Sequence, residues 1–297
     1  MAPNTVTGGP GSSPDVSVLI VNYHAYDELS GCLESLEARS AGDVEIVVVD
    51  HASTAAALEV LAQRFPRVHW LASESNPGFA AGVNRAAEVA HGRYLLLLNP
   101  DCVVDHDLCG VLSAWLDAHP DVGVAGSLVR DADGAIQASA RRFPGLTTGF
   151  AGRTSWLTRA WPGNAFSRRN LLTGPEVTAP ITVDWVSGAC MMVRRTAFTA
   201  VGGMDEHFFL YWEDADLCAR LAAVGWRTAY YPGVSVTHLC GRSSRASARS
   251  VRAFHRSALR YFVKHGGWLA RITAPLAFAA LQTRAALVLL RRRPGAR

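Results

Sequence analysis

The sequence predicts an α/β protein with a mostly parallel central sheet, helices on both faces of that sheet and a C-terminal helical extension. Three observations predict this fold class. Short runs rich in Val, Ile and Leu alternate with segments of helical periodicity over the first third of the chain, a pattern typical of parallel sheets covered by helices. Polar residues follow several of these runs directly. An apolar segment interrupted by arginines lies near the C-terminus.

The first third of the chain provides four strands and three helices. We expect strands at Val16–Asn22, Glu45–Asp50, Val68–Ala72 and Tyr94–Asn99. We expect helices at Tyr26–Ala38, Thr54–Phe65 and Gly82–Ala90. Ligands of parallel sheets bind beyond the carboxyl ends of the strands. The polar residues at those ends, among them Asn22, Asp50 and Asp101, are therefore candidates for a ligand site.

The middle of the chain has a different composition. Residues 130–180 are rich in Gly, Pro, Arg and Trp and have weak periodicity, so we interpret them as a long functional loop with short helices. A strand is expected over TVDWVSGACMMVRR, which begins at Thr182, and a helix over TAFTAVGG after it. A further helix begins near Glu213 and ends at Gly225, which puts Asp214 in its first turn.

The two ends of the chain carry different signals. Residues 1–14 are polar without an apolar run, and we interpret them as a disordered leader without a signal peptide. The six cysteines lie far apart with no zinc spacing, which favours reduced thiols and a cytoplasmic location. Residues 243–297 are basic and contain no acidic residue, which favours an anionic membrane surface over nucleic acid as a partner.

The segment Trp268–Leu290 is apolar, but Arg271, Gln282 and Arg284 interrupt it, and Pro275 is expected to kink it. Because charges near the centre of a spanning helix are costly, we expect an amphipathic helix in the membrane interface, on the inner face of the plasma membrane. Two alternatives stay open. The helix packs on the rest of the protein, or it is a solvated basic helix.

Two motifs carry carboxylates suited to chemistry. Asn99-Pro100-Asp101 follows an expected strand, where a carboxylate can bind a divalent cation; a simple turn explains the motif equally well. Three acids, Glu213, Asp214 and Asp216, crowd the start of an expected helix. Such crowding raises a carboxyl pKa and suits a general base, whereas helix capping explains only one of the three acids.

Two further motifs are weaker when taken alone. His238 follows an expected strand, and a lone histidine is usually structural, so only proximity to Asp101 makes it a metal ligand. The segment from Asn76 to Asn84 contains Gly78 and Gly82 before a helix, whose free N–H groups suit an anion or a sugar hydroxyl. It is neither a P-loop nor a dinucleotide fingerprint.

The order of these motifs resembles the inverting family 2 glycosyltransferases of the GT-A fold, and within them the bacterial rhamnosyltransferase-like members. The resemblance covers Val16 to Arg242. It rests on the segments VSVLIVNYHAYDEL, EIVVVDHAST, NPGFAAGVNRA, YLLLLNPD, VDWVSGACMMVRRTAFTAVGGMDEHFFLYWEDADLCARLAAVGW and VTHLCGRSS. It implies a catalytic domain over residues 15–242, with residues 130–180 on the acceptor side.

The resemblance also implies roles for individual residues. Asp214 would be the catalytic base of a single displacement with inversion, and Asp101 and His238 would bind Mg²⁺ or Mn²⁺. The implied donor-binding residues are Asn22, Asp50, Ser53, Asn76, Gly78, Asn84, Asn99, Asp101 and Arg141 (or its neighbour Arg142). The implied acceptor-binding residues are Trp185, Gly188, Trp212 and Glu213.

Two residues depart from the family pattern. Asn99 replaces the first acid of the metal-binding DxD motif, and His51 stands where asparagine is usual after Asp50. His51 either modifies base recognition or points into solvent. Neither departure removes an essential charge.

The function predicted from the resemblance is transfer of a sugar, L-rhamnose from dTDP-L-rhamnose, to a hydroxyl of a polyprenyl-diphosphate-linked saccharide in cell-envelope glycan synthesis. One alternative is a UDP-hexose-dependent transferase for another glycan or a secondary metabolite. A second is a non-catalytic subunit that binds a sugar nucleotide. A third, a Rossmann-type oxidoreductase, lacks a glycine fingerprint after the first strand. A homodimer is one oligomeric state that the sequence leaves open.

Overall fold

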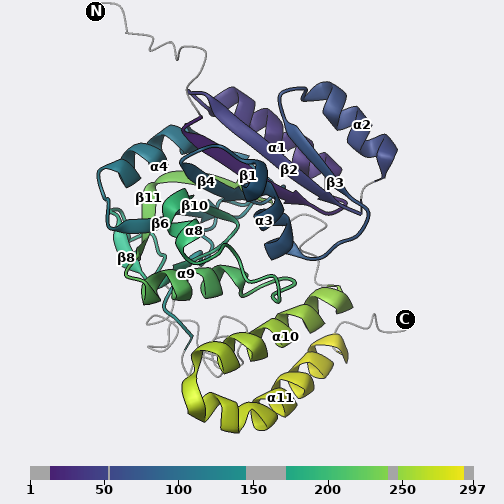
Figure 1. Ribbon diagram of the computed structural model, residues 1–297, viewed down its shortest axis with the longest axis vertical. Coiled ribbons are helices and arrows are strands. Elements are labelled where there is room, and N and C mark those ends of the chain that lie inside the picture. The colour runs from purple at the N-terminus through teal and green to yellow at the C-terminus, as the bar shows by residue number, and fades with distance from the viewer. Residues whose placement is uncertain (1–13, 53, 145–171, 240–246, 291–297) are drawn as a thin grey trace, which may run out of the picture.

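The computed structural model describes residues 14–52, 54–144, 172–239 and 247–290 (Figure 1). The expected leader, Ser53, most of the 130–180 loop and the last seven residues lie outside the described residues. Within the described part, an α/β unit carries a helical hairpin at its C-terminal end. The predicted fold class, including the C-terminal helical extension, is confirmed.

A nine-stranded sheet forms the centre, in the order β3-β2-β1-β4-β10-β6-β11-β5 with β8 beside β11. Six strands (β1 to β4, β6 and β11) run in one direction, and β5, β8 and β10 run in the other. The strands are β1 Val16–Asn22, β2 Val44–His51, β3 His69–Ser73, β4 Tyr94–Leu98, β5 Cys102–Val104, β6 Val122–Arg130, β8 Ile181–Val183, β10 Cys190–Arg194 and β11 Arg227–His238.

Helices cover both faces of this sheet, because alternate side chains of each strand point to opposite faces. Val18 and Ile20 of β1 pack on one face, and Leu19 and Val21 pack on the other. The first face is covered by α1 Tyr26–Arg39, α2 Ala55–Arg64 and α4 Leu108–Asp117. The second face is covered by α3 Phe79–Val89, α8 Arg195–Ala200 and α9 Glu213–Ala223.

The single strand expected from Thr182 is wrong, because that segment forms three strands. β8 and β10 join the central sheet, and between them β9 Trp185–Val186 pairs with β7 Ala140–Arg141 in a separate two-stranded sheet. Asp184 leaves the central sheet because its Oδ2 accepts a hydrogen bond from the Phe143 amide at 2.7 Å. The turn after β9 returns the chain to the central sheet at β10.

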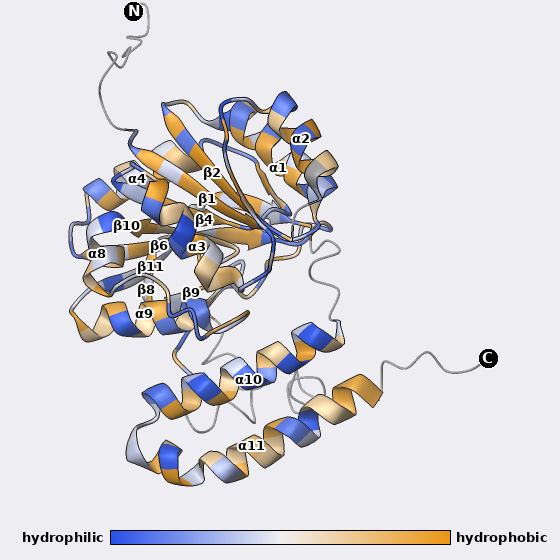
Figure 2. Ribbon diagram, turned by 45° about the vertical axis from the view of Figure 1, so that its right-hand side comes forward, coloured by the Kyte–Doolittle hydropathy of each residue, from blue (hydrophilic) through white to orange (hydrophobic). Residues whose placement is uncertain are grey.

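The C-terminal hairpin consists of α10 Ala248–His265 and α11 Gly267–Leu290. Gly267 has φ +69°, a conformation that glycine adopts without strain, and this permits the sharp turn between the helices. In Figures 1 and 2, α10 lies between the α/β unit and α11, so α11 is the outermost layer. Helix α11 continues through Pro275.

Helix α11 is long and apolar enough to cross a membrane by length and composition, and only 6% of its most apolar stretch is buried. Many residues of α11 are apolar (Figure 2), and many of their side chains are exposed. The exposed large apolar side chains are Trp268, Leu269, Ile272, Leu276, Phe278, Leu287 and Leu290. Its inner side chains Ala270 and Ala285 are buried. These exposed side chains contradict the alternative in which α11 buries its apolar surface against the rest of the protein.

Candidate active site

The carboxyl ends of β1 and β2 hold a buried polar pair. Asn22 and Asp50 occupy matching positions on the two parallel strands, and neither is accessible to solvent. Asn22 Nδ2 donates to Asp50 Oδ1 at 2.8 Å, while the Tyr26 hydroxyl donates to Asp50 Oδ2 at 3.1 Å. The Asp50 carboxylate is therefore held in one orientation. Sequence reasoning missed Tyr26, although its position at the start of α1 was a usable signal.

The segment that precedes α3 is held against a distant part of the chain. Asn76 Oδ1 accepts from the Gly78 amide at 2.9 Å, and Gly78 has φ +114°. A Cβ at Gly78 would lie 2.5 Å from the Phe209 carbonyl oxygen, so only glycine fits. The Phe79 amide donates to that same oxygen at 2.9 Å. This contact joins the predicted donor loop to the segment before α9.

Asn84 and His51, which lie near this loop, both contact it or the segment before α9. Asn84 uses its side-chain amide on the loop before α9: Oδ1 accepts from the Met204 amide at 2.8 Å, and Nδ2 donates to Met204 O and Glu206 Oε1, both at 2.9 Å. His51 is buried, not solvent-exposed, and its Nε2 lies 3.2 Å from Gly78 O. Burial lowers the pKa of His51, so it is a neutral link between β2 and the α3 loop.

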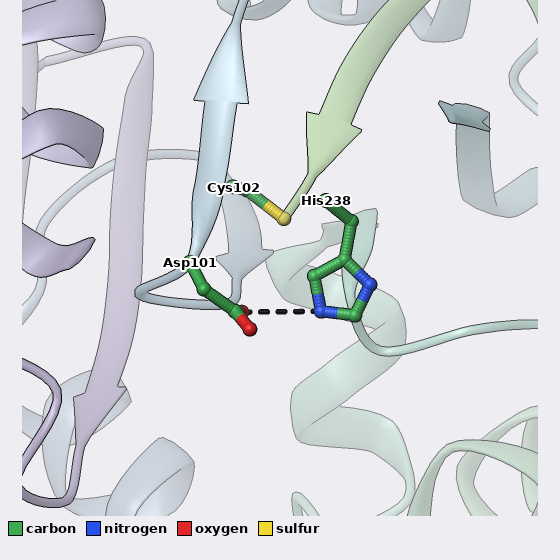
Figure 3. Close-up of side chains that lie close together, drawn as sticks. All are labelled: Asp101, Cys102 and His238. Atoms are coloured by element: carbon green, nitrogen blue, oxygen red, sulfur yellow. Dashed lines mark ion pairs between the residues drawn. The ribbon is translucent and has the colours of Figure 1, made fainter. Parts of the chain in front are cut away.

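Asp101 and His238 come together where β5 pairs with the end of β11. Figure 3 shows the two side chains pointing toward one another, with Asp101 Oδ1 and His238 Nε2 3.1 Å apart. Asn99 Nδ2 lies 3.3 Å from the same His238 nitrogen. Asp101 is 2% exposed. The proximity that the metal hypothesis required is present, and the ligand role of these residues stays a prediction.

Gln137 orients the histidine ring, a role that sequence reasoning missed because nothing local marks it. Gln137 Oε1 lies 3.2 Å from His238 Nδ1. When Nδ1 carries the proton, the Nε2 lone pair faces the Asp101 carboxylate. A lone pair and a carboxylate oxygen at that distance repel each other unless a cation or a proton lies between them. The donor set therefore fits a divalent cation.

Cys102 also lies within reach of this pair: its Sγ and the Asp101 and His238 ligand atoms all lie within 4.8 Å of one another (Figure 3). Its thiol donates to the Ala189 carbonyl oxygen at 3.4 Å. Burial, with smaller contributions from neighbouring thiols and Asp101, raises the pKa of Cys102 well above its ordinary value. Cys102 is therefore a neutral packing residue. The candidate metal ligands are the Asp101 carboxylate and a ring nitrogen of His238.

Asp214 lies in the first turn of α9, as predicted. The Gly188 amide donates to its Oδ2 at 3.1 Å and the Ala215 amide to its Oδ1 at 2.8 Å. Burial raises the pKa of Asp214, and the two amides and the charge of Arg141 offset only part of that rise. A carboxylate with a raised pKa is a better proton acceptor than an exposed one.

The pKa of Glu213 depends on the neighbouring Asp214 carboxylate. Burial first, and then the negative charge of Asp214, raise the pKa of Glu213 to about 8. Burial and the neighbouring carboxylate thus favour the protonated form of Glu213. Within the described chain, Glu213 Oε2 and Trp212 Nε1 are buried and form no hydrogen bond. A buried donor and a buried acceptor without partners, beside a candidate base, suit a ligand with hydroxyl groups.

Trp185 and Arg141 form the wall beside Asp214. They face each other across the β7–β9 pairing, with the Arg141 guanidinium 5.0 Å from the Trp185 ring centroid. The indole N–H of Trp185 donates to Arg142 O at 3.0 Å. Because the Arg141 charge acts on Asp214, Arg141 lies on the side of the candidate base. Its predicted role toward the donor stays a prediction.

The turn between β9 and β10 brings the two halves of the site together. Gly188 binds Asp214 through its amide, and the next residue, Ala189, accepts a hydrogen bond from the Asn99 amide at 3.0 Å. A Cβ at Gly188 would be 3.7 Å from the Asp214 Cβ. The candidate base and the Asp101–His238 pair therefore flank one short turn.

Solved structures show which fold this is. The chain is similar to the mannosyltransferase PcManGT from Pyrobaculum calidifontis, solved with GDP-Man and Mn²⁺, with a TM-score of 0.58 and 18% identity over 96% of this chain and 79% of that one. At this identity the likeness concerns the fold, which is that of the GT-A glycosyltransferases. The chain therefore has the fold of the GT-A glycosyltransferases.

The chain belongs to glycosyltransferase family 2: the family model "Glycosyltransferase like family 2" matches residues 14–256. It is 34% identical over 270 residues to the N-acetylglucosaminyl-diphospho-decaprenol L-rhamnosyltransferase of Mycobacterium tuberculosis, which covers 84% of this chain and 85% of that protein. It is 25% identical to the rhamnosyltransferase WbbL of Escherichia coli K12, over 84% of this chain and 93% of that protein. The predicted family and enzyme class, with the inversion typical of family 2, are confirmed.

Proposed function

We propose that this glycosyltransferase moves L-rhamnose from dTDP-L-rhamnose to a hydroxyl of a polyprenyl-diphosphate-linked saccharide in cell-envelope glycan synthesis. The names and extent of the two rhamnosyltransferase relatives support the sugar and the acceptor class. The observation that carries the proposal is the half-buried Asp214, whose pKa is raised and which lies beside two buried polar atoms without hydrogen-bond partners among the described residues.

The acceptor half of the reaction uses residues 212 to 214. The indole N–H of Trp212 donates to an acceptor oxygen, and the Glu213 carboxyl binds a neighbouring hydroxyl. Asp214 takes the proton of the attacking hydroxyl as that oxygen bonds to the anomeric carbon. The bond from the anomeric carbon to the diphosphate breaks on the opposite face, so the configuration inverts. Trp185 and Gly188 line the acceptor groove beside this base.

The donor half of the reaction uses the ends of β1 and β2. Asp50, held by Asn22 and Tyr26, binds the pyrimidine of the nucleotide, because a fixed carboxylate accepts from an imide N–H. Asn76 and Gly78 shape the loop over the sugar, and Asn84 fixes that loop. Ser53 is retained as a donor contact on the resemblance alone.

A divalent cation, Mg²⁺ or Mn²⁺, fits between Asp101 and His238, with Asn99 beside them. When bound, it supplies positive charge that stabilises the leaving diphosphate. An imidazole nitrogen in the donor set favours Mn²⁺ over Mg²⁺, which prefers oxygen ligands. Asp101→Ala is expected to abolish the metal-dependent part of donor binding. Equal nucleotide affinity with and without metal in the wild-type protein would contradict this assignment.

We also propose that residues 15–242 form the catalytic domain and that the 243–297 extension holds it on the inner face of the plasma membrane. The exposed apolar side chains of α11 and the absence of acidic residues from the extension support this. Arg271 and Arg284 interrupt the apolar stretch of α11, where a charge is costly in a spanning helix, and so favour a helix that lies in the interface. Deletion from Trp268 onward should release the protein from vesicles containing anionic lipid; retention would contradict the proposal.

The deciding experiment is a calorimetric titration with dTDP and with UDP, each with and without Mn²⁺, followed by a transfer assay. The assay uses dTDP-L-rhamnose and decaprenyl-diphosphate-linked N-acetylglucosamine. Metal-dependent preference for dTDP and an inverted product support the proposal. Preference for UDP favours the UDP-hexose alternative, and nucleotide binding without any transfer favours the non-catalytic subunit.

A further inference from the structure

The segment before the candidate base has an unusual backbone. Tyr211 and Trp212 have φ values of +68° and +73°. Large side chains rarely adopt this left-handed conformation, and it persists only where the surroundings hold it. Two such residues in succession set the direction from which α9 begins, and therefore the position of Asp214. The contacts that hold them are thus of functional interest.

Those contacts come from α10. The Phe254 ring lies 5.7 Å from the rings of both Tyr211 and Trp212, and the Tyr261 ring lies 5.3 Å from the Trp212 ring. Ser257 Oγ donates to the Leu210 carbonyl oxygen at 3.0 Å. Residues 254, 257 and 261 are three and four positions apart, so they share one face of α10.

The same face continues into charged contacts one turn further on. Lys264 Nζ lies 2.7 Å from Asp205 Oδ2 and 2.7 Å from Asp216 Oδ1. His265 Nε2 lies 2.7 Å from the same Asp216 oxygen, and Arg220 Nε lies 2.8 Å from the other. Asp216 is fully buried. A buried carboxylate that binds two cations and a histidine ring is rigidly placed, and removal of a cationic partner is costly.

We propose that α10 is a positioning element of the active site: its Phe254, Tyr261 and Lys264 side chains fix the 209–216 segment so that Asp214 and Trp212 meet the acceptor. The inference rests on the proposed function for the role of Asp214. It assigns to the C-terminal extension a second task besides membrane contact. Without these contacts the left-handed pair relaxes, and the base moves away from the attacking hydroxyl.

The competing explanation is that α10 merely attaches the hairpin to the catalytic domain. Phe254→Ala in the full-length protein separates the two, with Phe254→Tyr as the conservative variant. Leu112→Ala is the stability control, because Leu112 is fully buried in α4 on the opposite face of the sheet. It should lower the melting temperature while transfer measured well below that temperature stays near wild type.

Positioning predicts a specific pattern for Phe254→Ala. The kcat for transfer should fall about 10-fold or more, because small displacements of a catalytic group cost that much, while the Kd for dTDP with Mn²⁺ changes less than about twofold. Backbone amides of residues 209–216 should exchange with deuterium faster, and Phe254→Tyr should restore both readouts. Lys264→Met should act similarly, with rescue by Lys264→Arg.

Two outcomes would overturn the inference. One is unchanged kcat and unchanged exchange at 209–216 in Phe254→Ala. The other is an equal loss of kcat in Leu112→Ala and Phe254→Ala when the two variants have the same melting temperature. Lower stability alone would then explain the loss of kcat. The exchange readout needs no acceptor. Failure of wild-type protein to transfer sugar would therefore refute the proposed function, while exchange still tests whether α10 holds the segment.

Discussion

The proposed donor edge and the proposed acceptor side of this molecule are built in different ways. At the donor edge, Asn22, Tyr26 and Asp50 come from consecutive elements of the first 50 residues, and adjacent parallel strands bring them together. On the acceptor side, Arg141, Trp185, Asp214 and Phe254 come from four separated parts of the chain. Local order specifies the first region, whereas long-range packing specifies the second.

This difference predicts separable defects. Variants at the donor edge should change nucleotide affinity, and variants on the acceptor side should change the rate of transfer. The largest expected effect is that of Asp214→Asn. It removes the proton acceptor, so kcat should fall about 10³-fold, while calorimetry gives a Kd for dTDP within about twofold of wild type. Asp133→Asn, an equal charge change on an exposed loop, is the control. Normal turnover in Asp214→Asn would remove Asp214 from the mechanism.

Gln137→Leu should have the next largest effect, which is on metal affinity. It tests a contact between the acceptor side and the candidate metal site. Gln137 belongs to the loop on the acceptor side, yet it orients His238. Loss of such an orienting contact usually lowers metal affinity about 10–100-fold. Mn²⁺ titration of the protein with dTDP measures this directly. If Mn²⁺ affinity is unchanged, His238 either does not bind the metal or needs no orientation.

Tyr26→Phe should have a smaller effect, confined to the donor edge. It removes the hydroxyl that donates to Asp50 and accepts from the Thr54 amide. One hydrogen bond of this kind is worth about 1 kcal/mol, so the Kd for dTDP should rise about fivefold while kcat at saturating donor stays the same. A fall in kcat with unchanged Kd would break the proposed division between the regions.

Glu213→Gln should give the smallest effect, visible in the pH dependence of stability. The pKa of Glu213 is raised to about 8 in the folded protein. The stabilising contribution of its protonated form is complete below the ordinary carboxyl pKa and is lost as pH rises through about 8. Glutamine does not titrate, so the wild type should lose stability relative to the variant as the pH rises from 6 to about 8. Urea denaturation at pH 6, 7, 8 and 9 measures this difference; parallel curves would contradict the raised pKa.

The same contrast explains what the sequence predicts. The strands from Val16 to Leu98 agree with prediction to within one residue at each end, because a short continuous run of Val, Ile and Leu is a local signal of a buried strand. Asn22 pairs with Asp50 because both lie at the carboxyl ends of the adjacent parallel strands β1 and β2. Helix α3 begins earlier than expected, at Phe79, because the Phe209 carbonyl, far away in sequence, accepts from its first amide.

The acceptor side could be predicted only as a set of residues, and only through the family resemblance. No local pattern indicates that Trp185 leaves the central sheet for a two-stranded one, because that depends on pairing with Arg141. No local pattern indicates that Gln137 reaches His238 or that Phe254 reaches Trp212. Each contact is decided by the packing of elements 40 or more residues apart, as in the 42 residues between Trp212 and Phe254.

The layered hairpin has a consequence for how the substrate arrives. Helix α10 separates α9 from α11 (Figure 1), and packed helices lie about 8–10 Å apart. In the proposed arrangement with α11 in the lipid interface, the helix that carries the proposed base stands roughly 20 Å above it. The hairpin would then set the height above the membrane at which a lipid-linked saccharide of sufficient length meets the enzyme without leaving its lipid.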